Sequence, residues 1–176
     1  MAFKLYKNAL KTFINWSLFL VIFTMSYRAL GQEVTTYYLI RHAEKETVDS
    51  NERNPHLTLK GKKRALEWKT ILKAVPFDKI YSTSYFRTQE TASPLAEERT
   101  LPIENYDPRK LYNKSFQKQN EGKTVLVVGH SNTTPSLANR IIGKETYLQI
   151  EDSIHGYLYI LQIIEGKVTH QLLNIE

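Results

Sequence analysis

The chain has 176 residues, of which 41% are hydrophobic and 24% charged, and it contains no cysteine. This length suits one globular domain, and the composition excludes a collagen-like, low-complexity or disulfide-stapled chain. Four of the 24 basic residues lie within the first 31 residues, which hold no Asp or Glu, so the rest of the chain carries 20 basic against 18 acidic residues. Because a nucleic-acid-binding domain needs a basic face, this near balance gives such a partner little support, and we expect no nucleic acid.

The segment 1–31 differs in character from the remainder. Three lysines precede an apolar run at 13–25, and Ala29-Leu30-Gly31 places small residues at its first and third positions. This is the pattern of a secretory signal peptide, because a membrane-spanning helix needs ~20 apolar residues. It predicts cleavage after Gly31 and export to the periplasm or the medium, with a retained membrane anchor and a buried helix as alternatives. Membrane contact is expected only if the segment is retained. Residues 32–176 form one domain.

The first half of this domain alternates strand and helix patterns. In chain order we predict a strand at 34–40, a polar loop at 41–56, a helix capped by Thr58 that reaches residue 75, a short strand at 77–81 and a helix at 84–98 that Pro94 kinks or breaks. A 3.6-residue period predicts that the first helix turns its apolar residues inward, namely Ala65, Leu66, Trp68, Ile71, Leu72 and Val75.

The second half supplies the centre and the edge of the sheet. Residues 99–123 are polar and predict loops with at most a short strand or helical turn, whereas the continuous apolar run at 124–128 suits a strand buried on both faces. A helix at 135–142 and a closing hairpin around Glu165-Gly166 follow. The fold class is therefore α/β, a three-layer sandwich with a mostly parallel central sheet, one antiparallel edge and flanking helices.

Polar clusters follow three of these strands. Arg41-His42 follows the first strand, Gly129-His130-Ser131-Asn132-Thr133 follows the central one, and a hydroxyl-rich segment with Arg87 follows the short one. In open α/β sheets ligands bind beyond the carboxyl ends of the strands. Two arginines and two histidines suit a tetrahedral oxyanion such as phosphate, and a neutral imidazole is a competent nucleophile. We expect no cofactor and no metal, and the H-E-x-x-H spacing of zinc sites is absent from the sequence.

Four sequence blocks, in this order, resemble the histidine phosphatase superfamily, which includes the cofactor-dependent phosphoglycerate mutases. They are Leu39-Ile40-Arg41-His42-Ala43-Glu44, Leu57-Thr58-x-x-Gly61, residues 81–92 and residues 128–133. The resemblance implies that His42 is the phosphorylated nucleophile and that Arg41, Arg87 and His130 bind the phosphoryl group. The backbone around Ser131 and Asn132 would add N–H donors to the substrate.

The sequence departs from the mutase-like pattern at the general acid. The register of the Leu101-Pro102 segment puts Leu111 or Tyr112 where the mutase-like branch has a Glu, and Glu104 and Asp107 lie nearby but off register. Glu44, close to His42 in sequence, is another candidate for the general acid. The short phosphohistidine phosphatases of the superfamily, which this chain resembles in length, also lack the mutase-type acid.

The leading interpretation is a metal-independent, histidine acid phosphatase-like phosphohydrolase that acts through a phosphohistidine. Its substrate would be a phosphorylated small molecule or a phosphoprotein, phosphohistidine included. Phosphoryl transfer of the phosphoglycerate mutase type and a catalytically weak phosphate-binding module are the alternatives. The segments that would cover the site are short, which predicts an open cavity.

Overall fold

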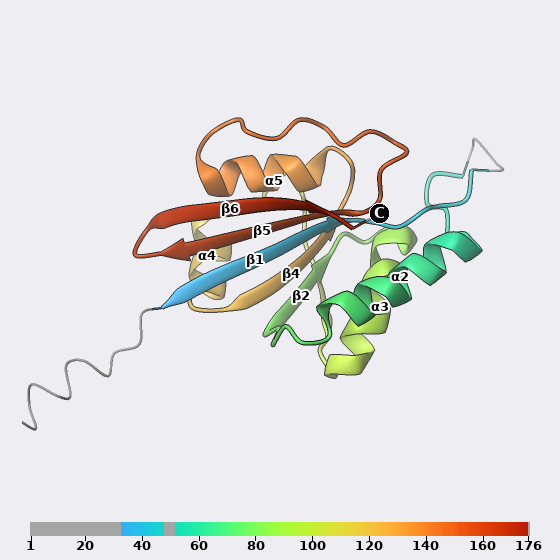
Figure 1. Cartoon of the computed structure of the whole chain (residues 1–176), viewed down its shortest axis with the longest axis horizontal. Coiled ribbons are helices and arrows are strands. Elements are labelled where there is room, and N and C mark those ends of the chain that lie inside the picture. The colour runs from blue at the N-terminus through green and yellow to red at the C-terminus, as the bar shows by residue number, and fades with distance from the viewer. Residues whose placement is uncertain (1–32, 48–51, 176) are drawn as a thin grey trace, which may run out of the picture. The chain divides into compact units, whose positions relative to one another are not determined.

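The computed structural model describes residues 33–47 and 52–175, so the predicted signal peptide or anchor at 1–31 lies outside the described residues. One six-stranded sheet has the order β3-β2-β4-β1-β5-β6 (Figure 1). The strands are β1 (Val34–Arg41), β2 (Lys79–Ser82), β3 (Ile103–Asn105), β4 (Thr124–Gly129), β5 (Tyr157–Ile164) and β6 (Lys167–Asn174). The first four pair in parallel, whereas β5 is antiparallel to β1 and β6 to β5. The described part of the chain holds no helix long and apolar enough to cross a membrane.

Helices cover both faces of the sheet (Figure 1). The pair α2 (Leu59–Leu72) and α3 (Phe86–Arg99) packs on one face, and α4 (Lys114–Asn120) and α5 (Thr133–Ile142) pack on the other. The predicted α/β three-layer sandwich with an antiparallel edge is confirmed.

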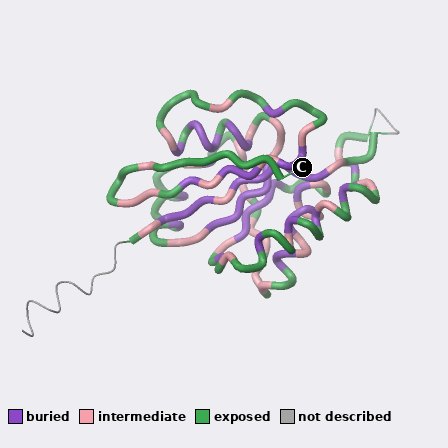
Figure 2. The backbone as a smooth tube through the Cα atoms, in the orientation of Figure 1, coloured by how far each residue is buried: buried purple, intermediate pink, exposed green. Residues whose placement is uncertain are grey.

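The central strands divide their side chains between the two layers. Val125 and Val127 of β4 join the cluster beneath α4 and α5, whereas Leu126 and Val128 join the cluster beneath α2 and α3. Alternation follows from the two-residue repeat of a strand, and each such buried side chain contributes about 1.5–3 kcal/mol relative to exposure. In Figure 2 the buried backbone, in purple, runs through the middle of the sheet, while β6 at the edge of the sheet is exposed.

The predicted hairpin is also confirmed. Glu165 and Gly166 connect β5 to β6, and both have positive φ angles, 50° and 75°. Positive φ at both central residues is the geometry of a two-residue turn whose twist matches that of the strands it joins. The hairpin therefore brings β6 back along β5 and completes the sheet.

The structure corrects three local predictions. Helix α2 ends at Leu72, and Leu66 and Ile71 are exposed, because only a narrow stripe of the helix reaches the sheet. Helix α3 continues through Pro94 to Arg99. The segment 99–123 holds both a strand and a two-turn helix, β3 and α4, rather than at most one of them.

The Leu57-Thr58-x-x-Gly61 block joins α2 to the chain that follows β1. The Thr58 side chain caps α2 by accepting a hydrogen bond from the Gly61 N–H at 3.0 Å, and the Thr58 N–H donates to the Glu44 carbonyl at 2.9 Å. A Cβ on Gly61 would lie 2.2 Å from that same carbonyl oxygen, which is backbone and cannot turn away. Glycine is therefore required here by the close approach of α2 to the segment that carries His42.

We predict that Gly61→Ala destabilises the fold by about 1–3 kcal/mol through this overlap. An alanine in a helix would otherwise stabilise by ~0.5–1 kcal/mol relative to glycine, so the sign of the change is diagnostic. Urea unfolding monitored by circular dichroism measures it, with exposed Lys62→Ala on the same helix as the control. Equal stability of the two variants would contradict the prediction.

Candidate active site

The carboxyl ends of three parallel strands meet at one cavity of about 630 Å³. His42 follows β1, His130 follows β4, and Arg87 lies in the first turn of α3 beyond β2. Six residues predicted from the sequence line this cavity, namely Arg41, His42, Arg87, His130, Ser131 and Asn132. The structure therefore brings together side chains that are up to 91 residues apart in the chain.

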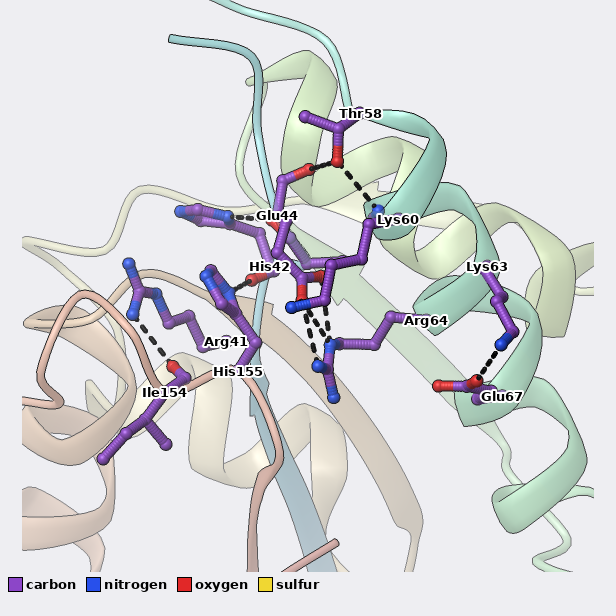
Figure 3. A network of polar contacts seen from close by, with 12 residues as sticks. Arg41, His42, Glu44, Thr58, Lys60, Lys63, Arg64, Glu67, Ile154 and His155 are labelled. Carbon is purple, nitrogen blue, oxygen red and sulfur yellow. Dashed lines mark hydrogen bonds and ion pairs between the residues drawn. The ribbon is translucent and has the colours of Figure 1, made fainter. Parts of the chain in front are cut away.

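His42 is held in one tautomer. Its Nδ1 lies 2.7 Å from the Ala43 carbonyl oxygen, and because a carbonyl only accepts, Nδ1 carries the proton (Figure 3). Its Nε2 is left with a lone pair. The ring is 3% exposed, and burial lowers its pKa to about 3, opposed by the Ala43 hydrogen bond and assisted by His130 and by the positive charges of Arg87 and Arg41. The imidazole is therefore neutral, as a nucleophile must be.

The second imidazole is oriented by two threonines. His130 Nε2 lies 3.0 Å from the Thr83 hydroxyl, which lies 2.8 Å from the Thr88 hydroxyl. The Thr88 hydroxyl donates to the Tyr85 carbonyl at 2.8 Å, and this fixed acceptor gives the chain its direction, with His130 Nε2–H as the first donor. Burial lowers the pKa of His130 to about 4, and Arg87 and Arg41 add to the effect.

Arg41 is anchored by the loop after α5. Its Nη1 donates to the carbonyls of Glu151 at 2.8 Å and Ile154 at 2.9 Å and lies 3.2 Å from that of Asp152, while Nη2 lies 3.2 Å from Asp152 Oδ1 (Figure 3 shows the Ile154 contact). Its Nε is buried with no acceptor among the described residues.

Arg87 faces the cavity with still fewer partners. Its Nη2 lies 3.5 Å from His130 Nδ1, and its guanidinium carbon sits 4.2 Å from the centroid of the Tyr85 ring. Its Nε and Nη1 are buried with no acceptor in the described parts of the chain. Burial lowers the pKa of Arg41 and of Arg87, yet an arginine stays protonated in a protein.

The N–H groups of Arg41 and Arg87 that lack acceptors define an anion site. Buried N–H donors on charged groups are costly without acceptors, and three guanidinium nitrogens of Arg41 and Arg87 have none among the described residues. An oxyanion in the cavity would supply those acceptors and compensate both charges. Tetrahedral phosphate offers several oxygens to such a set, in bonds of the charge-assisted kind.

Two further elements hold the site together. The Thr91 hydroxyl of α3 donates to the Arg87 carbonyl at 2.7 Å and accepts the Ala43 N–H at 2.9 Å, so it ties the residue after His42 to the helix of Arg87. Asn132 directly precedes α5, and the Ser131 carbonyl accepts the Ile150 N–H at 2.9 Å. Ser131 and Asn132 thus lie at a helix N-terminus beside the cavity, as the resemblance implied.

The structure does not support Glu44 as a general acid. Both its carboxylate oxygens accept from Arg64, at 2.9–3.0 Å, and Lys60 lies 3.2 Å away (Figure 3). Burial alone would raise its pKa, but the bonds from Arg64 and Lys60 hold it at about 2, so the group is ionised and has no proton to give. Glu44 also does not line the cavity and instead joins α2 to the segment after β1.

Sequence reasoning missed several residues of the site. His155 is buried, with its ring centroid 6.1 Å from that of His42. Its Nδ1 lies 3.0 Å from the His42 carbonyl oxygen, so it contacts the backbone that follows β1 (Figure 3). Lys45, Arg109 and Asp152 line the cavity. No sequence signal marked them, because the loops that carry them have no repeating pattern.

Comparison with known proteins matches part of this chain to a family. The sequence profile of the histidine phosphatase superfamily (branch 1) matches residues 37–108, which include three of the four predicted blocks. A search of curated proteins finds no significant match.

Solved structures share the fold over most of the chain. The protein histidine phosphatase SixA complexed with tungstate has a TM-score of 0.65 at 16% identity, covering 79% of this chain and 96% of that one. An alpha-ribazole phosphatase from Shigella flexneri has a TM-score of 0.61 at 20% identity, with coverages of 79% and 96%. A phosphoglycerate mutase from Bacillus anthracis str. Sterne has a TM-score of 0.61 at 18% identity, with coverages of 81% and 93%. The predicted resemblance to the histidine phosphatase superfamily is confirmed over residues 37–108, and the structural matches show the same fold.

The lowered histidine pKa values predict an acid-sensitive fold. The unfolded chain binds protons on His42 and His130 below about pH 6.5, whereas the folded protein binds them only near pH 3 to 4. Stability is therefore greatest above pH 6.5 and decreases as the pH falls, by about 1–2 kcal/mol per histidine between pH 6.5 and 5. Urea unfolding in phosphate-free buffers tests this, and the variant His42→Gln/His130→Gln should show a flatter profile. A wild-type stability unchanged over this interval would contradict the prediction.

Proposed function

We propose that this protein is a phosphatase that hydrolyses phosphate monoesters or a phosphoprotein through a phosphohistidine on His42. One observation carries the proposal: a neutral, buried imidazole with a free Nε2 lone pair lies at a cavity where guanidinium N–H groups lack acceptors. The sequence match to histidine phosphatases supports it.

The chemistry follows from the arrangement of the side chains. The phosphoryl oxygens would bind to Arg41, Arg87 and the backbone N–H groups near Ser131 and Asn132. His130 would join them once its Nδ1 is protonated, because its Nε2–H is held by the Thr83 hydroxyl. His42 Nε2 would attack phosphorus, its Nδ1–H remaining on the Ala43 carbonyl, which supports the positive charge that forms on the ring. The cationic groups would stabilise charge on the three equatorial oxygens in the transition state. Water would then hydrolyse the phosphohistidine.

Structurally similar proteins are consistent with this substrate chemistry. Their names describe a protein histidine phosphatase with bound tungstate, an alpha-ribazole phosphatase and a phosphoglycerate mutase. All three names point to phosphoryl chemistry, on a protein in one case and on small molecules in the others. For this chain we propose the shared class, a phosphorylated small molecule or a phosphoprotein.

The two alternative functions fit the site less well. A mutase must shield its phosphohistidine from water, but this cavity is lined by side chains as exposed as Arg109 at 88% and Asp152 at 94%. A phosphate-binding module without catalysis would not need the tautomer of His42 to be fixed with a free Nε2.

We further propose that residues 1–31 direct export and that the mature protein begins at Gln32. The sequence pattern of basic, apolar and small residues supports this proposal. Mass spectrometry of the protein purified from its native host is expected to find an N-terminus at Gln32. An intact Met1 on protein recovered from the membrane would support a retained anchor instead.

Replacing the nucleophile tests the main proposal. We expect His42→Ala to lower kcat for 4-nitrophenyl phosphate by at least ~10³-fold, because the covalent route through phosphohistidine is lost. Steady-state assays at neutral pH measure this, and wild-type enzyme mixed with ³²P-labelled substrate and quenched in alkaline detergent should carry an acid-labile, alkali-stable phosphoryl group on His42.

His170→Ala, on exposed strand β6, is the control and should retain wild-type turnover. Phosphoglycerate tests the mutase alternative, which requires isomerisation to exceed release of inorganic phosphate. Wild-type turnover in His42→Ala would contradict the proposed function, and phosphate binding without any turnover in the wild type would favour the binding module.

A further inference from the structure

Hydrolysis of an alkyl phosphate leaves an alkoxide that must receive a proton, and the site described so far supplies none. Among the described residues that line the cavity, Asp152 has the one carboxylate. The other acidic candidates, Glu44, Glu104 and Asp107, do not line this cavity. Glu44 is bound by Arg64, Glu104 pairs with Lys79 at 3.1 Å, and Asp107 pairs with Arg109 at 3.1 Å.

We propose that Asp152 is the general acid that protonates the leaving group, an inference that rests on the phosphatase function proposed above. Its carboxylate is placed by Arg41, whose Nη2 lies 3.2 Å from Asp152 Oδ1. The same guanidinium holds the backbone around it through the carbonyls of Glu151 and Ile154. A residue that binds the phosphoryl group therefore also positions the acid.

The direction of displacement puts the leaving group on the side of Asp152. In an in-line displacement the leaving oxygen departs on the side of phosphorus opposite the nucleophile. His42 lines the cavity and is 3% exposed, so an oxygen that departs away from it moves toward the open, solvent side. The Asp152 side chain, 94% exposed, lies on that open side and within hydrogen-bond reach of Arg41.

The substrate itself can supply the proton. Arg41, Lys45 and Arg109 line the same cavity as Asp152, and a bound phosphoryl group would bring negative charge to these cations. A phosphate monoester also carries a proton of its own below its second pKa of about 6, and this proton can pass to Asp152 on binding.

The proposed cycle balances its protons. As the bond from His42 Nε2 to phosphorus forms and the bond to the leaving oxygen breaks, Asp152 gives its proton to that oxygen and an alcohol departs. A water molecule then attacks phosphorus and gives a proton to the Asp152 carboxylate. The N–P bond breaks, its electron pair returns to Nε2, and inorganic phosphate leaves. The substrates that gain from such an acid are alkyl phosphate monoesters, whose alkoxides are poor leaving groups.

The test compares two leaving groups in one variant. Asp152→Asn keeps an oxygen that can accept from Arg41 but cannot serve as the acid. For glycerol phosphate, which needs protonation, we expect kcat/KM to fall by ~10²–10⁴-fold. For 4-nitrophenyl phosphate, whose leaving group is stable as an anion, we expect the fall to stay below ~10-fold. Glu121→Gln makes the same change of a carboxylate to an amide at an exposed position outside this cavity and should alter neither substrate by more than ~2-fold.

Three outcomes would overturn the assignment. An equal fall for both substrates would show that Asp152 only positions Arg41. Unchanged or increased turnover of glycerol phosphate would show that the carboxylate merely competes with phosphate. Wild-type enzyme that hydrolyses only 4-nitrophenyl phosphate would show that no acid operates. In each case His42-dependent hydrolysis of 4-nitrophenyl phosphate keeps the phosphatase function intact, whereas its absence in the wild type would remove the function itself.

Discussion

The burial of positive charge around one cavity is the constraint on which the rest of the site depends. Arg41 is 4% exposed and Arg87 has two buried nitrogens without acceptors among the described residues. The free-energy cost of burying these two positive charges is reduced in different ways. Three carbonyls of the loop after α5 face Arg41, and the Tyr85 ring faces Arg87. What remains uncompensated is the part that an anionic substrate can satisfy, so binding energy is built into the empty protein.

The imidazoles tolerate this neighbourhood because they are neutral. Beside two guanidiniums a protonated His42 or His130 would add repulsion to the cost of burial, which is why burial and the neighbouring cations both lower their pKa values. The same conditions keep the nucleophilic lone pair on His42 Nε2. Burial and the neighbouring positive charges thus both disfavour a protonated His42 and keep its Nε2 lone pair available. A bound phosphoryl group would bring negative charge and reduce the repulsion among the positive groups.

The carboxylates of Glu44 and Asp152 have different partners and different positions relative to the cavity. Glu44, two residues after His42, is bound to Arg64 and connects α2 to the segment after β1, away from the cavity. Gly61 permits that connection because α2 approaches the Glu44 backbone closely. Asp152 is the carboxylate that reaches the cavity among the described residues, on a loop that Arg41 itself holds. Separation of the two carboxylates keeps negative charge from cancelling the anion site while leaving one group at its open side.

Local pattern sufficed for some elements and failed for others. The apolar run that forms β4 and the Glu165-Gly166 turn were predicted correctly, since burial on both faces and positive φ angles leave clear signatures in sequence. The inward positions of α2 were predicted too broadly, because periodicity states which residues share a face but not how much of that face meets the sheet. Helix α4 was missed as a helix because its single buried aromatic residue, Phe116, gives no repeating pattern.

The sequence by itself determined the fold class and predicted that Arg41, His42, Arg87 and His130 gather at one cavity, because each lies at or shortly after the carboxyl end of a strand and these ends face the same edge of a parallel sheet. Only the tertiary structure decided which carboxylate belongs to the cavity. Glu44 is two residues from His42 and Asp152 is 110 residues away, yet Asp152 lines the cavity and Glu44 does not. Closeness along the chain does not specify where a side chain points once a strand has ended. Each carboxylate is positioned by the arginine that binds it, Arg64 for Glu44 and Arg41 for Asp152.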